Sequence, residues 1–141
     1  ADTHRHRHTL VAALSAKIEM ELGELEADEA AAFMSELGLT ESSLGRVIRL
    51  SYKLLGLISF LTAGPDEVRA WPIPEGSSAV DAAGAIHTDL ARGFIRAEVV
   101  PYDDLIELGS TAEARRHGKL RSEGKTYQVR DGDVIEVLFS R

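Results

Sequence analysis

The sequence predicts an α+β fold with a helical first part and a second part that mixes strands and helices. Up to Gly56, apolar residues recur at the spacing of amphipathic helices, whereas from Leu57 onward their spacing is that of strands. The second part then has the order of a strand hairpin, one helix and further strands, which is typical of α+β domains. We therefore predict two domains, residues 1–56 and residues 57–141.

The first part is predicted to begin with a strand that leads directly into a helix. The run Leu10–Leu14 is aliphatic throughout, and Ser15 after it has the side chain of a helix N-cap. The next helix places Ile18, Leu22 and Leu25 on one face, because they are spaced by four and three residues. Such helices normally pack on a parallel sheet, which we expect to be supplied by residues outside this chain.

Two more helices are predicted before the second part begins. Asp28 is the expected cap of the first of them, and Gly38 is its expected end. The other is expected to start at Thr40 or Ser42 and to stop at Gly56.

The second part is predicted to open with a hairpin. Leu57–Ala63 is the outgoing strand, Gly64–Asp66 the turn and Val68–Ile73 the returning strand. Pro72 lacks a backbone N–H, so its strand is expected at a sheet edge or at a bulge.

A helix and a third strand are predicted next. Ser78–Asp81 has the pattern of a capping box, and the helix that it opens is expected to run past Leu90 to Gly93. Phe94–Val100 is the expected third strand.

The remaining residues are expected to form short elements. A short helix is predicted around Thr111–His117, and two strands, Tyr127–Val129 and Val134–Phe139, are predicted on either side of the turn Arg130–Asp133.

The composition limits the classes of function. The 141 residues, 44% hydrophobic and 28% charged, can bury one sizeable core. Cysteine is absent, which excludes disulfides and thiolate metal sites. No signal peptide or membrane span is recognisable, so we expect a cytoplasmic protein without a membrane partner. The net charge of −7 is the wrong sign for a protein that binds nucleic acid over its whole surface.

Basic residues nevertheless gather near the end of the chain and are a candidate contact for RNA. The alternative is an ordinary solvated face, because Glu113 and Glu123 are interleaved with them. The candidate contact residues are Arg115, Arg116, Lys119 and Arg121, with Lys125 and Arg130 nearby.

Other polar residues are better explained by structure than by chemistry. His87 and Asp89 lie too close together on a helix to form a catalytic relay, so a local hydrogen bond is expected. Asp103 and Asp104 are expected to cap a short helix, and Trp71 to pack in the core. The alternating His4–His8 stretch lacks a carboxylate or thiolate partner and is expected to be a surface linker.

A longer pattern carries a family resemblance. It begins at Ser15-Ala16-Lys17, where an aliphatic run ends in Ser-Ala-Lys and continues into a helix, and it extends over nearly all of the chain that follows. The matching segments are Leu57–Gly64, Glu67–Pro74, Ala82–Leu90, Gly93–Glu98, Gly118–Tyr127 and Asp131–Val134. Together they resemble the C-terminal region of the YchF/Obg-like ATPases, P-loop NTPases that carry a TGS domain.

The resemblance implies that the two parts of the chain belong to different domains. Residues 1–56 would be the C-terminal part of a P-loop NTPase domain of the Obg type, and residues 57–141 a TGS domain with the ubiquitin-like β-grasp fold. Ser15, Ala16 and Lys17 would form the last base-contacting loop, whose small alanine lets a backbone N–H approach a purine edge. The chain contains no Gly-x-x-x-x-Gly-Lys-Ser/Thr motif, so the phosphate loop would lie in an N-terminal domain that is its partner.

The resemblance also implies a function. The whole protein would bind and hydrolyse ATP or GTP with Mg²⁺, regulate translation or redox responses, and associate with the ribosome or ribosomal RNA as a monomer. No nucleotide is expected on this chain alone, and no catalytic or metal-ligating residue is assigned within it. The alternative is a free-standing regulatory TGS module that works through protein contacts, although such a module has no need of Ser15-Ala16-Lys17.

Overall fold

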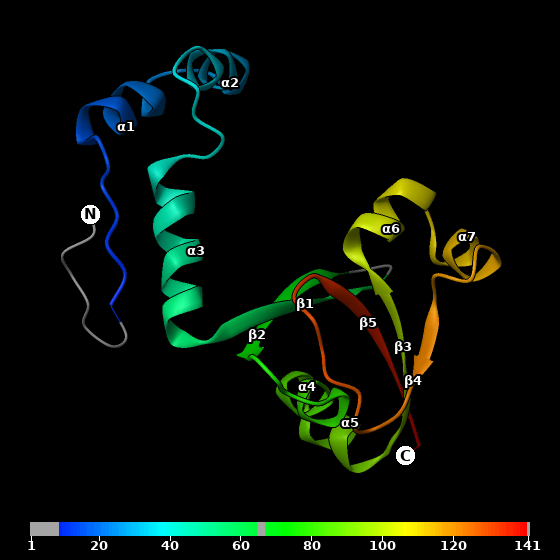
Figure 1. Cartoon of the computed structure of the whole chain (residues 1–141). Helices are drawn as coiled ribbons and strands as arrows, with labels where there is room; N and C mark the ends of the chain where they lie inside the picture. The colour runs from blue at the N-terminus through cyan, green and yellow to red at the C-terminus, as the bar shows by residue number, and fades with distance from the viewer. Residues whose placement is uncertain (1–8, 65–66, 141) are drawn as a thin grey trace. The chain divides into compact units, whose positions relative to one another are not determined.

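A computed structural model describes residues 9–64 and 67–140. The chain divides into two compact units, Ala1–Leu55 and Gly56–Arg141 (Figure 1), which are treated separately below. The His4–His8 stretch and the centre of the predicted Gly64–Asp66 turn lie outside the described residues.

The first unit consists of three helices, α1 (Ala16–Gly23), α2 (Ala27–Glu36) and α3 (Ser43–Leu55). None of the three contains a buried residue. Large apolar side chains remain at the surface instead, including Leu44 at 66% and Leu55 at 69% exposure. This part of the chain therefore has helices without a core to pack on.

The helix ends follow the sequence signals in most cases. Ser42 Oγ accepts a hydrogen bond from the backbone N–H of Gly45 at 3.1 Å, which confirms Ser42 as a start of α3. Gly38 and Gly56 adopt left-handed φ angles of 66° and 64° after α2 and α3. The cap predicted at Asp28 is wrong, because Glu26 occupies the N-cap position and Asp28 lies in the first turn.

The strand predicted at Leu10–Leu14 is also wrong. The described residues before α1 form no secondary structure, and Leu10, Val11 and Leu14 are exposed. A strand requires a neighbour to complete its backbone hydrogen bonds, and no described strand pairs with this segment. The Leu10–Leu14 segment thus has the aliphatic composition of a strand, but no described strand lies beside it to form a sheet.

The second unit confirms the α+β class with one five-stranded sheet (Figure 1). Its strands are β1 (Leu57–Ala63), β2 (Val68–Pro74), β3 (Phe94–Pro101), β4 (Arg121–Glu123) and β5 (Asp133–Phe139). The strand order is β2-β1-β5-β3-β4. The central β1 and β5 pair in parallel, and every other neighbouring pair is antiparallel.

Four short helices accompany the sheet: α4 (Ala79–Ile86), α5 (Thr88–Arg92), α6 (Tyr102–Leu108) and α7 (Thr111–Arg116). The capping box predicted at the start of α4 is confirmed, because Ser78 and Asp81 each bond the other's backbone N–H. The single helix predicted to continue to Gly93 is instead broken at His87, which is extended (φ −162°, ψ 142°). Its Nδ1 accepts a hydrogen bond from Asp89 N at 3.1 Å and thereby caps α5.

Two apolar clusters lie on the two faces of the sheet. The larger one joins the sheet to α4 and includes the fully buried Phe60, Ala83 and Val99. The smaller one contains Val100 and Ala114 and is completed by leucines of α6 and neighbouring segments. Because adjacent strand residues point to opposite faces, Val99 and Val100 belong to different clusters.

One predicted strand lies elsewhere along the chain. Tyr127–Val129 makes only an isolated bridge through Gln128 to Ser78, whereas the unpredicted β4 pairs with β3. The backbone of the Tyr127–Val129 segment bonds instead to the residues around the start of α4, with Ala79 N donating to Tyr127 O at 2.8 Å. The segment therefore serves as a support for α4 and not as a member of the sheet.

Pro72 lies in an edge strand, as predicted. The N–H of Glu75, just after β2, bonds inward to Gly56 O at 2.8 Å, so the even-numbered residues of β2 present their backbone polar groups outward. Pro72 and Pro74 occupy two of these outward positions. Neither proline removes a hydrogen bond from the β1–β2 ladder.

Candidate functional site

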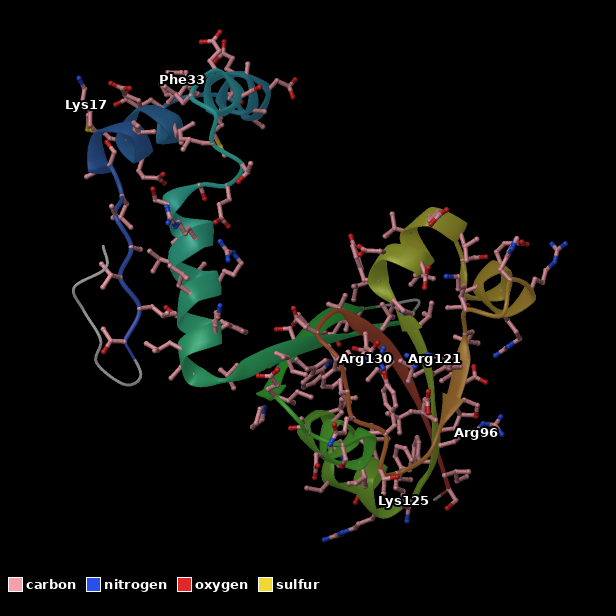
Figure 2. The ribbon with its side chains drawn as sticks, viewed as in Figure 1. Lys17, Phe33, Arg96, Arg121, Lys125 and Arg130 are labelled. Atoms are coloured by element: carbon pink, nitrogen blue, oxygen red, sulfur yellow. The ribbon has the colours of Figure 1, made fainter. Side chains whose placement is uncertain are left out.

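The Ser15-Ala16-Lys17 loop forms the beginning of α1. Ser15 Oγ accepts a hydrogen bond from Ile18 N at 3.4 Å, as expected of an N-cap. The Lys17 side chain is 81% exposed, and its Nζ lies 3.9 Å from Glu21 (Figure 2). The helix start therefore leaves the lysine extended into solvent and available for a contact outside this unit.

A carboxylate connects this helix to α3. Glu19 accepts a hydrogen bond from the backbone N–H of Ser43 at 2.8 Å, at the first residue of α3. Hydrogen bonds from the Ser43 side chain and backbone hold the pKa of Glu19 below its usual value. The start of α1 is thus fixed against the start of α3, close to the Ser15 loop.

An open depression of about 430 Å³ lies beside the loop. Its lining includes Leu14, Ser15 and Ile18 from the α1 side and Arg46 and Arg49 from α3. The lining combines apolar side chains with hydrogen-bonding groups, as small-molecule sites do.

The guanidinium of Arg49 forms a bidentate ion pair with Glu41 beside this depression. The hydrogen bonds from Arg49 lower the pKa of Glu41. No group of three metal-ligating side chains occurs within residues 9–64 and 67–140.

The four basic residues predicted to contact RNA are all engaged in ion pairs. The pairs are Arg115–Glu98 at 2.6 Å, Arg116–Glu113 at 2.8 Å, Lys119–Asp104 at 3.0 Å and Arg121–Glu123 at 3.2 Å. The side chains of Arg115, Arg116 and Lys119 are more than half exposed, so a phosphate can reach them beside their carboxylates. Arg121 is only 33% exposed and also donates to Tyr127.

The structure does not bring these four residues together into one patch. Arg121 is opposite Val99 in the sheet register and so lies on the face that packs on α4. Arg115 pairs with Glu98, the residue next to Val99, on the other face. Figure 2 shows Arg121 nearer the middle of the second unit and Arg96 and Lys125 at its outer edge.

Asp133 has a buried carboxylate on the face of the sheet that packs on α4. The sequence predicted this residue only as part of a turn. Asp133 is 2% exposed, and its Oδ2 accepts hydrogen bonds from Tyr127 Oη at 2.7 Å and from Arg130 N at 2.9 Å. Arg121 donates to Tyr127 Oη at 2.9 Å and lies 3.8 Å from Asp133. Burial, followed by the hydrogen bond to Asp133, raises the pKa of Tyr127.

Of the remaining candidates, Trp71 has the structural role predicted for it. Trp71 packs beside the core, with its ring stacked on Phe60 at a centroid distance of 6.4 Å. Trp71 Nε1 donates to Thr62 at 3.0 Å, and the Arg69 guanidinium lies 4.1 Å from the ring centroid. The caps predicted at Asp103 and Asp104 are wrong, because Pro101 occupies the N-cap position of α6 and the two carboxylates lie in its first turn without a capping hydrogen bond.

No helix in the described part of the chain is long and apolar enough to cross a membrane. This finding agrees with the short and interrupted apolar runs of the sequence.

Comparison with known proteins identifies relatives along most of the chain. A family model named YchF-GTPase_C, described as "Protein of unknown function (DUF933)", matches residues 57–140. The "Ribosome-binding ATPase YchF" of Bacillus subtilis (strain 168) is 52% identical over 130 residues, which are 92% of this chain and 36% of that protein. The protein of the same name from Escherichia coli O157:H7 is 48% identical over 132 residues, 94% of this chain and 36% of that protein.

A solved structure matches as well. The Schizosaccharomyces pombe YchF GTPase gives a TM-score of 0.71 at 35% identity, covering 84% of this chain and 31% of that chain. This chain thus spans only about a third of the length of each of these relatives.

Proposed function

Because this chain belongs to the YchF family, we propose that it is the C-terminal portion of a ribosome-binding protein that hydrolyses a purine nucleoside triphosphate. The observation that carries this proposal is its similarity to relatives named ribosome-binding ATPases, at 52% and 48% identity over nine-tenths of the chain. This chain matches about a third of the length of those relatives. This coverage supports the proposal that the phosphate loop lies in the other two thirds of the whole protein. The proposed place of action is the cytoplasm, where ribosomes are found.

The second unit is proposed to be a TGS domain with the β-grasp fold. The order of a hairpin, a helix and further strands supports this proposal, as does the β2-β1-β5-β3-β4 sheet whose two central strands are parallel. One face of the sheet packs on α4, while the other packs on residues of α6 and α7. Such a domain offers surfaces and edges, which suits a role in docking.

The first unit is proposed to complete a P-loop domain whose other part is supplied by the rest of the same protein. Its exposed apolar residues and the unpaired Leu10–Leu14 segment support this proposal, because both lack the sheet that they need. Ser15, Ala16 and Lys17 would then border the purine base, while ATP or GTP phosphates and Mg²⁺ bind elsewhere in the protein. This chain would supply only the base end of the site.

This chain alone is expected to bind neither ATP nor GTP, because phosphate and Mg²⁺ contacts provide most of the affinity of such sites. Titration calorimetry with each nucleotide and Mg²⁺ should detect no saturable heat. Saturable binding in the micromolar range would contradict the assignment of Ser15, Ala16 and Lys17 to the base end alone.

The second unit is expected to take the chain to the ribosome, with Arg115, Arg116, Lys119 and Arg121 as the proposed contacts to ribosomal RNA. Replacing Arg115, Arg116 and Lys119 with alanine should reduce co-sedimentation with ribosomes at low salt. Arg121 is left in place in this variant because it also donates to Tyr127 in the network of the buried Asp133. The difference from the unmodified chain should shrink as salt rises, because the variant releases fewer counterions and has a shallower salt slope.

A charge-matched control separates local contacts from overall charge. Replacing Lys53, Arg69 and Arg92, which lie outside this basic cluster, with alanine changes the net charge equally and should affect co-sedimentation much less. Equal losses in both variants would reduce the proposed contact to a general charge effect. An unmodified chain that fails to sediment with ribosomes at any salt would contradict the docking role itself.

A further inference from the structure

An open depression of about 460 Å³, called the pocket below, lies where β1, the 130–133 turn and the start of α6 meet. Leu61 and Pro101 give it an apolar lining, and Tyr102 adds an aromatic ring that is 47% exposed. Asp103 and Asp131 contribute two carboxylates. The pocket thus combines apolar surface, one ring and two negative charges, all from the second unit.

Three hydrogen bonds fix the segments that form this pocket. Gly132 N donates to Ser59 O at 2.8 Å, and Ser59 N donates to the Asp131 carboxylate at 2.8 Å. Tyr102 N donates to Gly132 O at 2.9 Å. Since strand, turn and helix start are connected in this way, a ligand would meet a site that needs little ordering on binding.

The negative charge of the pocket favours a positively charged ligand. Within the described residues, no ion pair involves Asp103 or Asp131, although the basic side chains of α7 and β4 all have carboxylate partners. An anion, such as an RNA phosphate, would meet two negative charges here. A cation would be stabilised by both carboxylates and by the face of the Tyr102 ring.

We propose that this pocket binds an arginine side chain from an extended, basic segment of a partner protein. The guanidinium stacks on Tyr102 and bonds the carboxylates of Asp103 and Asp131, while its aliphatic stem covers Leu61 and Pro101. This inference rests on the proposed docking function of the second unit and specifies the class of partner. None of the basic residues proposed to contact RNA lines this pocket.

The test uses the full chain and a short fluorescent peptide of alternating glycine and arginine. The double variant Asp103→Asn, Asp131→Asn removes two charges but keeps an oxygen to accept the Ser59 N–H. Its affinity for the peptide should fall by roughly fivefold to tenfold, measured by fluorescence anisotropy at low salt. Tyr102→Ala should weaken binding by about threefold, through loss of the ring face.

A matched control carries Glu67→Gln and Glu136→Gln, which remove the same charge outside the pocket. Its affinity for the peptide should stay within about twofold of the unmodified chain. Circular dichroism and melting curves should show all variants folded.

Equal losses in the pocket and control variants would overturn the proposal, as would an unchanged affinity of the pocket variant. Spermine is then tested as a competitor of the peptide. If spermine binding is weakened by the pocket substitutions as strongly as peptide binding is, the pocket is a site for free polyamines and the proposal is overturned. Peptide binding by a chain that does not sediment with ribosomes would contradict the docking role and leave the pocket assignment intact.

Discussion

Replacing Asp133 with alanine is expected to lower the free energy of unfolding of the second unit by about 3 kcal/mol. The carboxylate is 2% exposed and accepts hydrogen bonds from Tyr127 and from the backbone of Arg130. Its removal leaves both donors without their partner and takes a negative charge away from Arg121. Urea unfolding followed by fluorescence reports this unit specifically, because Trp71 is the single tryptophan of the chain.

Two further variants distinguish the charge of Asp133 from its shape. Asp133→Asn keeps an acceptor for both donors but turns an amide toward Arg121, so its loss should be smaller than that of Asp133→Ala. Asp103→Ala removes an exposed carboxylate that makes no ion pair with a described residue, and it should change stability by less than about 0.5 kcal/mol. Equal stabilities of Asp133→Ala and Asp103→Ala would show that the buried carboxylate does not hold the network together.

Phe60→Ala is expected to be still more damaging, with a loss of roughly 3–5 kcal/mol. Phe60 is fully buried between the sheet and α4, where it contributes to the larger cluster and stacks on Trp71. The substitution removes apolar area from the core and leaves a cavity that the rigid sheet cannot close. A loss of this size should lower the melting temperature by more than about 12 °C, measured by circular dichroism.

Phe139→Ala is the matched control for this substitution. Phe139 lies at the end of β5 and is 41% exposed, so the same chemical change there removes much less buried surface. Its melting temperature should stay within several degrees of the unmodified chain. Similar losses for the two phenylalanines would contradict the position assigned to the core.

The elements that were predicted correctly carry their signals locally. The capping box that begins α4 involves groups only three residues apart, so the sequence contains the whole interaction. The strands β1 and β2 were predicted from the strand-like spacing of their apolar residues and a turn signal between them, and Pro72 predicted that β2 lies at the sheet edge.

The wrong predictions depend on partners that are distant in sequence or outside the chain. Leu10–Leu14 has a strand composition but no described neighbour to bond with. Arg121–Glu123 is polar and short, so only its pairing with β3 makes it a strand. The break at His87 arises because its ring competes with the helix for the Asp89 N–H, which an apolar periodicity does not reveal.

In the candidate sites, too, local interactions could be predicted from the sequence and contacts between distant residues could not. Ser15 could be placed at a helix start from the sequence, since a cap is a local interaction. The clustering of basic residues along the chain did not reveal that Arg115 and Arg121 lie on opposite faces of the sheet. The role of Asp133 was missed because its partners, Tyr127 and Arg121, become neighbours only when β4 and β5 join β3.

The two outward prolines of β2 affect how copies of this chain behave at high concentration. An open sheet edge is normally a template on which a second chain adds as a further strand, with donors and acceptors alternating along it. Pro72 and Pro74 lack two of the donors that such an added strand would require, while their carbonyl groups remain. We therefore expect an added strand to pair with β2 only along its first residues, where Val68 is 73% exposed.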